Sequence, residues 1–597
     1  MATYSASDLD YQRLLKAARR LSLPQSAPTI RIAILADCAT QQLALLLRVL
    51  LGEAGLRAEV YEAPFAAIEL ESCAPDSGLY RFAPDAVIVL NCAQALRAAH
   101  ACQGNEQADF AAQHLARIVG VWAAVQSHCE AMILQSTFAL PPDSPYGNFG
   151  LSVPGSLRAS VAVLNAGIAA AARDCARVRI HDVEGVASWV GRDRFFDERA
   201  WDLWKAPCSL EELPRVANNM VSVLLALRGG VVKCVVTDLD NTLWGGVIGD
   251  DGLDGIVLSA HGGGAGESYV RLQQFLKQLR ARGVLLAVCS KNEATTALAP
   301  FLEHPDMVLR RDDISVFVAN WEDKASGIRR VRDELGIGLD SMVFLDDSPF
   351  ERNLVRELLP EVIVPELPED PSRFVAFLSE LNLFETAYLS SEDRQRAALY
   401  QHEAQRRVVA AQSASVQDYL RSLDMQAVLA RFDRFHMPRI AQLMQRSNQF
   451  NLCTRRLSEA QCAALAEDQA FIPLYAKLAD RLGDHGLISV VVLERDEQAL
   501  LVRDWLMSCR VLARGVEQFL MNYVVAQAAR FGLRRVIGEY IPTAKNAMVR
   551  DFFAQFGFTR VSATGDQWAL EVAAYRPVET FIRLVDPGTA IQAVEVP

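Results

Sequence analysis

The chain has 597 residues, which is too long for a single hydrophobic core and, at about 150 residues per domain, predicts three to four domains. Its composition, 51% hydrophobic and 22% charged residues, is typical of a soluble globular protein and excludes a disordered, collagen-like or fibrous chain. The 60 Lys and Arg residues against 72 Asp and Glu residues give a net charge of −12, which argues against nucleic acid as a partner.

The cysteines stand singly along the chain, with no C-x-x-C pair and no spacing typical of a zinc site. This dispersal predicts reduced thiols in a cytoplasmic protein. The first residues, MATYSASDLDYQRLLKAARR, lack the apolar core of a signal peptide. No segment reaches the roughly 18 to 20 apolar residues of a membrane span, so we expect no membrane partner.

The predicted fold class is α/β, divided among several domains. From Thr29 to about Gly185, β-rich runs such as IRIAILADC and PDAVIVLNC alternate with helical runs, which is typical of a parallel, doubly wound sheet. A second such series begins at VVKCVVTDLDNTLWGG, and the later runs LISVVVLERD and ALLVRDWLMSC favour an antiparallel or mixed sheet. The predicted parts are an α/β domain (1–190), a connecting segment (191–230), a second α/β domain (231–370), a helical bridge (371–424) and a last domain (425–597).

Two carboxylates, Asp238 and Asp240, follow the apolar strand candidate VVKCVV. Burying such a pair costs free energy unless a cation or a reaction requires it. Open parallel sheets bind ligands at the carboxyl ends of their strands, where this pair is expected to lie. Later strand candidates are followed by further polar groups, which are Ser290 in AVCSKN, Lys324 in NWEDKAS, and Asp346 and Asp347 in VFLDDSPFER.

This order of motifs resembles the haloacid dehalogenase superfamily. The resemblance implies that Asp238 attacks phosphorus and that Asp240 protonates the leaving oxygen and later activates water. It implies a Mg²⁺ ion held by Asp238, the Asp240 backbone carbonyl and the late acidic pair, with Asp347 the better direct ligand and Asp346 a supporting one. The side chains expected to bind the substrate's phosphoryl group are those of Thr242, Ser290, Lys291, Asn292 and Lys324.

The stretch between Asp238 and Ser290 contains the Gly-rich segment GDDGLDGIVLSAHGGGAGESY. This composition favours a minimal cap rather than a folded cap domain. We therefore expect an open active site that admits a large or macromolecular substrate.

Longer motifs narrow the resemblance, namely DLDNTLWGGVIGDDG, VLLAVCSKN, VFLDDSPFERNLVRELLPEVIVPELPEDP, RSNQFNLCTRR, GDHGLISVV and DWLMSCRVLARGVE. Over about 195–570 they resemble the FkbH family, which makes glyceryl thioesters for polyketide biosynthesis. The resemblance implies a bifunctional glyceryl transferase and phosphatase. Such an enzyme takes the glycolytic acyl phosphate 1,3-bisphosphoglycerate, removes phosphate and delivers the glyceryl group to the phosphopantetheine thiol of an acyl carrier protein. Lactyl loading, attributed to related members, is an alternative.

Acyl transfer through a thioester requires a nucleophile beyond the aspartates, and two cysteines compete for this role. Cys509 lies beside Arg510 and Arg514, whose charges favour the thiolate. His485, in the preceding strand candidate GDHGLIS, is a candidate base for it. Cys289 directly precedes the phosphate-binding serine on a strand, so its side chain is expected to face the core. We therefore favour Cys509, with a packed thiol as the alternative at that position.

The terminal domains carry further resemblances. In the last domain VLARGVEQFLMNYVVAQAARFGLRRV and IPTAKNAMVRDFFAQFGFTRV resemble GNAT acyltransferases, but the loop after Arg514 lacks the usual glycine spacing, which favours a carrier-protein arm over free coenzyme A. The N-terminal LADCATQQ resembles the first block of SGNH hydrolases, with Cys38 in place of their serine, and a docking or structural role is favoured over catalysis. Residues expected to line the GNAT-like pocket or a domain interface are Arg446, Asn448, Asn451 and Arg455.

Two other functions remain open. One is a phosphatase that acts on a small phosphate ester and has a structural GNAT-like domain. The other is a non-catalytic module that docks a carrier protein. The complete set of aspartates, serine and lysine argues against the second.

Overall fold

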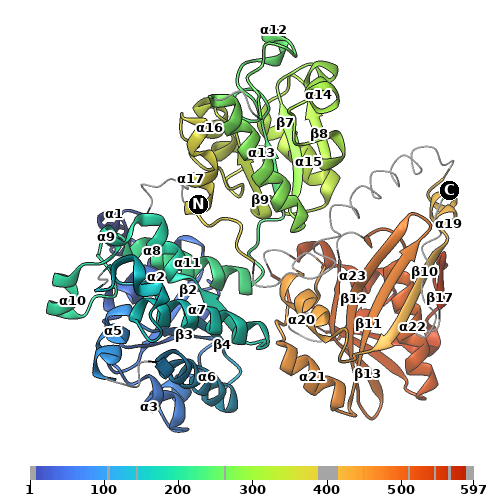
Figure 1. Cartoon of the computed structure of the whole chain (residues 1–597). Coiled ribbons are helices and arrows are strands. Elements are labelled where there is room, and N and C mark those ends of the chain that lie inside the picture. Colours follow the sequence, from blue (N-terminus) through green and yellow to red (C-terminus); the bar gives the residue numbers. More distant parts are fainter. Residues whose placement is uncertain are drawn as a thin grey trace. The chain divides into compact units, whose positions relative to one another are not determined.

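The computed structural model describes residues 9–103, 108–142, 145–260, 264–386, 415–447, 450–508, 511–543, 546–561 and 567–585. Within these ranges the chain divides into two compact units. The first lies within Met1–Leu227, Ile363–Pro368 and Arg373–Ala387, and the second within Arg228–Val362, Glu369–Ser372 and Tyr388–Pro597. The described residues form three separate sheets, one in the first unit and two in the second (Figure 1).

The first unit contains a five-stranded parallel sheet in the order β2-β1-β3-β4-β5. The strands are β1 (Thr29–Ala36), β2 (Arg57–Glu62), β3 (Ala86–Leu90), β4 (Met132–Ser136) and β5 (Val178–His181). The helices are α1 (Tyr11–Ala18), α2 (Gln41–Glu53), α3 (Ile68–Cys73), α4 (Gly78–Phe82), α5 (Ala93–Cys102), α6 (Phe110–His128), η3 (Gly147–Ser152), α7 (Leu157–Arg173), α8 (Val183–Val190), α9 (Arg192–Phe195), α10 (Glu198–Trp204), α11 (Leu213–Leu227) and α17 (Phe374–Glu380). The short η6 (Pro371–Arg373) spans the boundary between the two units.

Alternate residues of β1 build two cores. Ile32 and Ile34 pack against α2 on one face, whereas Ala33 and Leu35 pack against α6 and α7 on the other. Side chains of a strand alternate between its faces, so a strand buried on both faces is apolar throughout. The predicted doubly wound sheet is confirmed.

The predicted connecting segment, 191–230, is corrected by the structure. Helix α11 buries Leu213, Met220 and Leu224 in the same core as α2. Its Arg215 pairs with Glu380 of α17 at 2.8 Å. The boundary expected at 190 therefore lies inside the first unit, because the apolar face of α11 covers this sheet rather than linking two domains.

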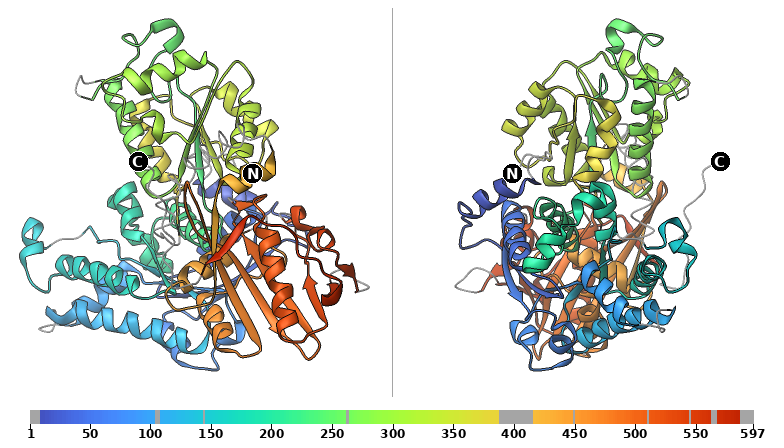
Figure 2. Two further views of the ribbon diagram at one scale, coloured as in Figure 1. Left: turned by 90° about the vertical axis from the view of Figure 1, so that its right-hand side faces the viewer. Right: turned by 60° about the vertical axis from the view of Figure 1, so that its left-hand side comes forward.

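The second unit begins with a four-stranded parallel sheet in the order β8-β7-β6-β9, with helices on both faces (Figures 1 and 2). Its strands are β6 (Cys234–Thr237), β7 (Leu285–Ser290), β8 (Val316–Ala319) and β9 (Met342–Leu345). Its helices are α12 (Ile248–Asp251), α13 (Ala265–Ala281), α14 (Ala294–Glu303), η4 (Arg311–Asp313), α15 (Lys324–Leu335), η5 (Leu339–Ser341) and α16 (Pro349–Leu358).

The C-terminal sheet has the order β15-β16-β14-β13-β12-β11-β10-β17, and only the pairs β13–β14 and β10–β17 are parallel among those described. Its long strands β11 (Phe471–Asp480), β12 (Gly483–Arg495) and β13 (Ala499–Met507) lie side by side (Figure 2). The other elements are α19 (Val416–Ser422), β10 (Met425–Arg431), α20 (Met437–Arg446), α21 (Glu459–Glu467), α22 (Val516–Arg530), β14 (Arg535–Glu539), η8 (Ala547–Val549), α23 (Phe552–Gln555), β15 (Thr559–Arg560), β16 (Gln567–Glu571), η9 (Val572–Ala574) and β17 (Ile582–Val585).

This mixed sheet completes the predicted multidomain α/β class. The helix α22 connects the parallel strands β13 and β14, as the strand-turn-helix pattern of the sequence predicted. Within the predicted helical bridge, 387–414 lie outside the described residues. Among the helices that the structure describes, none combines the length and apolar character needed to span a bilayer.

Candidate active site

The predicted motifs meet at one edge of the four-stranded sheet. Asp238 directly follows β6, Ser290 ends β7, Lys324 begins α15 after β8, and Asp346 follows β9. Because the strands are parallel, their carboxyl ends lie at the same edge, with β6 between β7 and β9. Asn241 supports the turn after β6, since its φ of 53° lies in the left-handed region that asparagine tolerates and its Oδ1 accepts a hydrogen bond from Gly246 N.

Lys324 joins three of these strand ends. Its Nζ lies 2.6 Å from Asp238 Oδ1 and 3.3 Å from Asp346 Oδ2, and it donates to the carbonyl oxygen of Cys289 at 2.9 Å. The side chain is 2% exposed. Burial alone would lower the pKa of this ammonium, but the two neighbouring carboxylates raise it above its ordinary value. Lys324 is therefore a fixed positive charge at the edge of the sheet.

Three carboxylates surround a position suited to a metal ion. Ligand oxygens of Asp238, Asp346 and Asp347 all lie within 4.8 Å of one another. Burial raises the pKa of Asp346 to about 7, the charge of Asp238 adds to this, and Lys324 opposes it. The pKa of Asp347 is also raised, first by burial and then by Asp238. Closely spaced, partly desolvated carboxylates facing one ammonium fit a hard divalent cation, which prefers oxygen ligands.

Asp240 is held apart from this carboxylate cluster. Its Oδ1 accepts hydrogen bonds from Trp244 Nε1 and Ile248 N, both at 3.0 Å. Its Oδ2 accepts from Asn292 Nδ2 at 2.7 Å, and the same amide group donates to Ser290 Oγ at 3.2 Å. These donors orient the second carboxylate independently of the first, which suits a separate acid–base role.

Two predicted phosphate-binding residues have other contacts. Thr242 is fully buried, and its Oγ1 accepts a hydrogen bond from Asp347 N at 3.2 Å. Lys291 Nζ pairs with Glu351 Oε1 at 2.6 Å. Thr242 thus positions Asp347 through its backbone, while Lys291 forms an ion pair with Glu351 of α16.

The sequence analysis missed Arg352, which positions the acidic pair. Its Nη1 donates to the carbonyl oxygens of Asp346 at 2.8 Å and Asp347 at 2.7 Å. The side chain is 4% exposed and lies on the first turns of α16. A basic residue one helical turn after an acidic strand end was the available signal. The contact between Trp244 and Asp240 could not be predicted from the sequence, because it depends on the conformation of the turn that follows β6.

Cys289 faces away from the Ser290 side of β7, as the alternation of strand side chains predicts. The thiol lies 3.6 Å from the carbonyl oxygen of Lys324, and a Cβ added at Gly327 would lie 2.4 Å from its sulfur. Burial raises the pKa of this thiol to about 12. A thiolate is therefore strongly disfavoured at this position.

In the C-terminal sheet two of the predicted residues meet. His485 Nε2 lies 3.0 Å from Asp480 Oδ2 and 2.9 Å from Arg514 Nη1. All three side chains are nearly fully buried. The structure thus places Arg514 beside the candidate base His485. It also places Asp480 beside His485, and no sequence motif indicated this residue.

The other predicted residues of this domain lie in a different set of contacts or outside the described residues. Asn451 is buried, and its Oδ1 accepts from Thr454 N at 2.7 Å within its own turn. Arg455 pairs with Glu539 at 2.9 Å. The predicted residues that fall outside the described ranges are Asn448, Cys509 and Arg510.

Before β7, the described residues between Asp238 and Ser290 form the four-residue α12, isolated bridges between Asp240 and Trp244 and between Gly245 and Val257, and α13. No cap sheet occurs in this described stretch, in keeping with the minimal cap predicted from its glycine-rich composition.

Comparisons with known proteins bear on the first unit and the four-stranded domain. Residues 31–225 match the FkbH N-terminal domain. The structure of the N-terminal part of the protein BF1531 from Bacteroides fragilis, which contains a phosphatase domain complexed with Mg, is 36% identical with a TM-score of 0.61. The match covers 64% of this chain and 99% of that one. No curated protein matches the chain.

Solved acetyltransferase structures also match. The ribosomal-protein-S18-alanine N-acetyltransferase from Escherichia coli is 13% identical over 24% of this chain and 94% of that one, with a TM-score of 0.20. The GNAT domain of S. lividans PAT is 19% identical over 24% of this chain and 89% of that one, with the same TM-score.

The strand-end carboxylates, the buried lysine and the BF1531 match define the four-stranded domain as a phosphatase domain of the haloacid dehalogenase type. Together with the matched N-terminal domain, this places the chain in its family. It belongs to the FkbH-like family.

Proposed function

We propose that this chain is a Mg²⁺-dependent bifunctional glyceryl transferase and phosphatase. It would take 1,3-bisphosphoglycerate and load the glyceryl group onto an acyl carrier protein for polyketide biosynthesis. The observation that carries the proposal is the division of labour between two carboxylates: Asp238 contacts Lys324, while Asp240 is oriented by three separate donors.

The phosphatase half follows from these two carboxylates. A carboxylate oxygen of Asp238 attacks the phosphorus of the phosphate ester, and the bond from phosphorus to the glyceryl oxygen breaks. Asp240 gives its proton to that leaving oxygen. Asp240 then takes a proton from water, which attacks the aspartyl phosphate and restores Asp238. Lys324, fixed between Asp238 and Asp346, would stabilise the negative charge on the phosphoryl oxygens.

The proposed metal ion is Mg²⁺, held by Asp238, Asp347 and the Asp240 backbone carbonyl, with Asp346 in support. The clustered carboxylate oxygens support this assignment, as does the Mg in the related Bacteroides fragilis phosphatase domain. A bound Mg²⁺ would offset and orient the charge of the phosphoryl group.

The transferase half requires a thiol. The sulfur of Cys509 would attack the acyl phosphate carbonyl, release that phosphate and form a thioester, and the 3-phosphate of the glyceryl group would be removed at the Asp238 site before or after this step. Exchange with the carrier's phosphopantetheine thiol would then return the cysteine. The burial and raised pKa of Cys289 disfavour that residue as the nucleophile. His485 beside Arg514 and Asp480 is the proposed base of this domain.

The first alternative is a phosphatase for a small phosphate ester, with a structural GNAT-like domain. The second is a lactyl-loading relative. The lack of a cap sheet between Asp238 and Ser290 in the described residues supports a macromolecular partner over the first alternative.

Intact-mass measurement separates these functions. The protein, Mg²⁺, freshly generated 1,3-bisphosphoglycerate and a holo carrier protein are incubated, and both proteins are weighed. We expect a glyceryl adduct on the carrier and none on its apo form. Phosphate release without any adduct on either protein contradicts the transferase and supports the small-molecule phosphatase. A carrier adduct formed from a lactyl donor but not from 1,3-bisphosphoglycerate supports the lactyl-loading alternative.

A further inference from the structure

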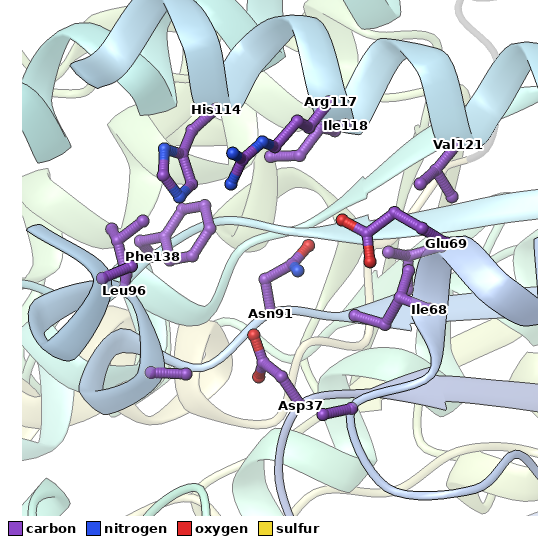
Figure 3. A pocket seen from close by; sticks show the side chains of 14 residues that line it. Asp37, Ile68, Glu69, Asn91, Leu96, His114, Arg117, Ile118, Val121 and Phe138 are labelled. Atoms are coloured by element: carbon purple, nitrogen blue, oxygen red, sulfur yellow. The ribbon is translucent and has the colours of Figure 1, made fainter. Parts of the chain in front are cut away.

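A cavity of about 140 Å³ lies in the N-terminal domain, and none of its lining residues is used in the proposed function. It opens at the carboxyl ends of β1 and β3, which are neighbours in the order β2-β1-β3. At this position of an open parallel sheet the connections of adjacent strands diverge to opposite faces, which leaves a crevice where ligands bind. Asp37 follows β1 and Asn91 follows β3, and both point into the cavity (Figure 3).

The amide of Asn91 is held in one orientation, with its NH₂ group directed at Asp37. Gln135 Nε2 donates to Asn91 Oδ1 at 3.0 Å, and Gln135 is itself fixed by Trp122 Nε1 at 2.9 Å. The oxygen of Asn91 is therefore occupied by the buried Gln135. Its nitrogen donates to the Asp37 carboxylate, where Cys92 N also donates to Oδ1 at 2.7 Å.

Two acidic side chains line the cavity, Asp37 and Glu69, and the charge of Glu69 acts on both Asp37 and His114. Burial raises the pKa of Asp37 to about 7, and its hydrogen bonds and the charge of Glu69 modify this value. Glu69 reaches in from α3 at the side (Figure 3). The neighbouring Cys38 does not line the cavity; its buried thiol contacts Cys92 instead. The pair Asp37 and Glu69 can accept hydrogen bonds from a hydroxyl or an ammonium group.

The opposite side belongs to α6, which presents Arg117 and His114 across the cavity (Figure 3). His114 Nδ1 lies 3.2 Å from the carbonyl oxygen of Phe110, so Nδ1 must carry the hydrogen and Nε2 has a free lone pair. Burial lowers the pKa of this imidazole, and Arg117 nearby adds to that effect. Within the described part of the chain, no ion pair or hydrogen bond engages the side chains of Arg117 or Glu69.

The remaining wall is apolar and sets the size of an occupant. Val89, Leu96, Ile118, Val121 and Phe138 line the space between the two polar ends. An engineered cavity of about 150 Å³ takes one benzene molecule, so this one suits roughly six to eight non-hydrogen atoms. Guanidinium groups pair well with carboxylates, and carboxylates accept from hydroxyl or ammonium groups.

We propose that this cavity binds a small bipolar acid of about three carbons, with its carboxylate on Arg117 and a hydroxyl or ammonium donor on Asp37 and Glu69. Asn91 and the neutral His114 complete the polar contacts, and the apolar wall excludes bulk water from the carbon chain. This site is independent of the phosphatase site and of the proposed transferase.

Calorimetric titration of the full chain with four matched compounds tests the proposal. Lactate carries a carboxylate and a hydroxyl, alanine a carboxylate and an ammonium, propionate only the carboxylate, and propane-1,2-diol only hydroxyls. We expect lactate or alanine to bind one per chain, and the better ligand identifies the donor. Propionate and the diol should bind roughly tenfold more weakly or worse, because each leaves one charged end of the cavity unpaired.

Variants locate the binding. Arg117→Gln should weaken binding of the better ligand by roughly tenfold to a hundredfold, since a charge-assisted hydrogen bond is lost. Arg173→Gln, an exposed arginine at the end of α7, should leave binding unchanged. Asp238→Asn should also leave it unchanged. No binding by any of the four compounds, equal effects of the two arginine variants, or loss of binding in Asp238→Asn overturns the proposal.

Discussion

Lys324 Nζ lies 2.6 Å from Asp238 Oδ1, and the lysine side chain that makes this contact is 2% exposed. Its second carboxylate contact, to Asp346, comes from the strand end on the other side of β6. A single buried ammonium thus holds together carboxylates that would otherwise repel one another. The stability of this edge of the sheet and its phosphoryl chemistry depend on the same charge.

Replacing this ammonium should damage both properties. Lys324→Met leaves buried carboxylates without their cation, so the metal-free protein should lose about 3 to 5 kcal/mol of unfolding free energy. Phosphate release should fall by roughly a hundredfold to a thousandfold at saturating Mg²⁺. Chemical denaturation and a phosphate assay measure the two effects.

The matched control for stability is Lys277→Met on α13. This lysine is 47% exposed and pairs with Asp313 at 3.3 Å, and such surface pairs contribute about 0 to 1 kcal/mol. Equal losses of stability in the two lysine variants would contradict the role given to Lys324.

The hydrogen bonds around Asp240 allow orientation to be separated from proton transfer. Asp240→Asn should lower kcat by roughly a hundredfold to ten-thousandfold, because the amide has no proton to exchange at neutral pH. Its amide nitrogen would face the NH₂ of Asn292, so the double variant Asp240→Asn with Asn292→Asp should restore the hydrogen bond and the stability. Recovery of kcat in the double variant would mean that Asp240 only positions its neighbours.

Metal binding should be visible as stabilisation. A ligand that binds only the folded state at a hundred times its Kd contributes about 2.7 kcal/mol, so Mg²⁺ should raise Tm and a chelator should reverse the rise. Asp347→Asn should reduce this gain, whereas Asp333→Asn, on an exposed part of α15, should keep it. An identical Mg²⁺ effect in the two variants argues against the assigned ligands.

The N-terminal cavity predicts a pH dependence of stability. The pKa of Asp37 is raised from 3.8 to about 7, so between these values the folded state holds a proton that the unfolded chain releases. Stability from this group is therefore present below about pH 4 and lost as pH rises through about 7. Asp346 and Asp504 shift in the same direction, so the test is a difference: Asp37→Asn should flatten the decline relative to the wild type. Parallel curves would show that Asp37 does not titrate in this range.

The environment of Cys289 predicts that it is chemically inert. Burial and a pKa raised to about 12 leave almost no thiolate near neutral pH, so native alkylation should miss this residue and Cys289→Ala should still form a glyceryl thioester. Cys509→Ala should not. Mass spectrometry of tryptic peptides detects both the alkylated cysteines and the glyceryl thioester. An enzyme adduct that persists in Cys509→Ala but is lost in Cys289→Ala would show that Cys289 is the nucleophile.

The sequence was sufficient to predict the strand ends of the phosphatase site. Apolar runs followed by Asp238, Ser290 and Asp346 specify parallel strands locally, and the shared carboxyl edge then brings these residues together without further information. The same local alternation predicted the inward direction of Cys289.

Contacts between distant segments were beyond the sequence. The helical spacing of apolar residues in α11 predicts that one face of this helix is buried. The same spacing cannot identify α2 of the first unit as its packing partner. The cavity beside Asp37 likewise depends on how α6 crosses the sheet edge, which brings Arg117 opposite a residue eighty positions earlier. The position of Arg352 after the acidic strand end could be read from the sequence, but its partners could not, because they are backbone carbonyls, which carry no residue-type signal.

Trapping the phosphoryl group on the enzyme tests the central claim most directly. The protein is mixed with a phosphate ester labelled at phosphorus, quenched in acid within one turnover and digested for peptide mapping. We predict label on the peptide that contains Asp238 in the wild type and none in Asp238→Asn. Label that persists in Asp238→Asn, or phosphate release by that variant at the wild-type rate, would contradict the nucleophile on which this account of the protein rests.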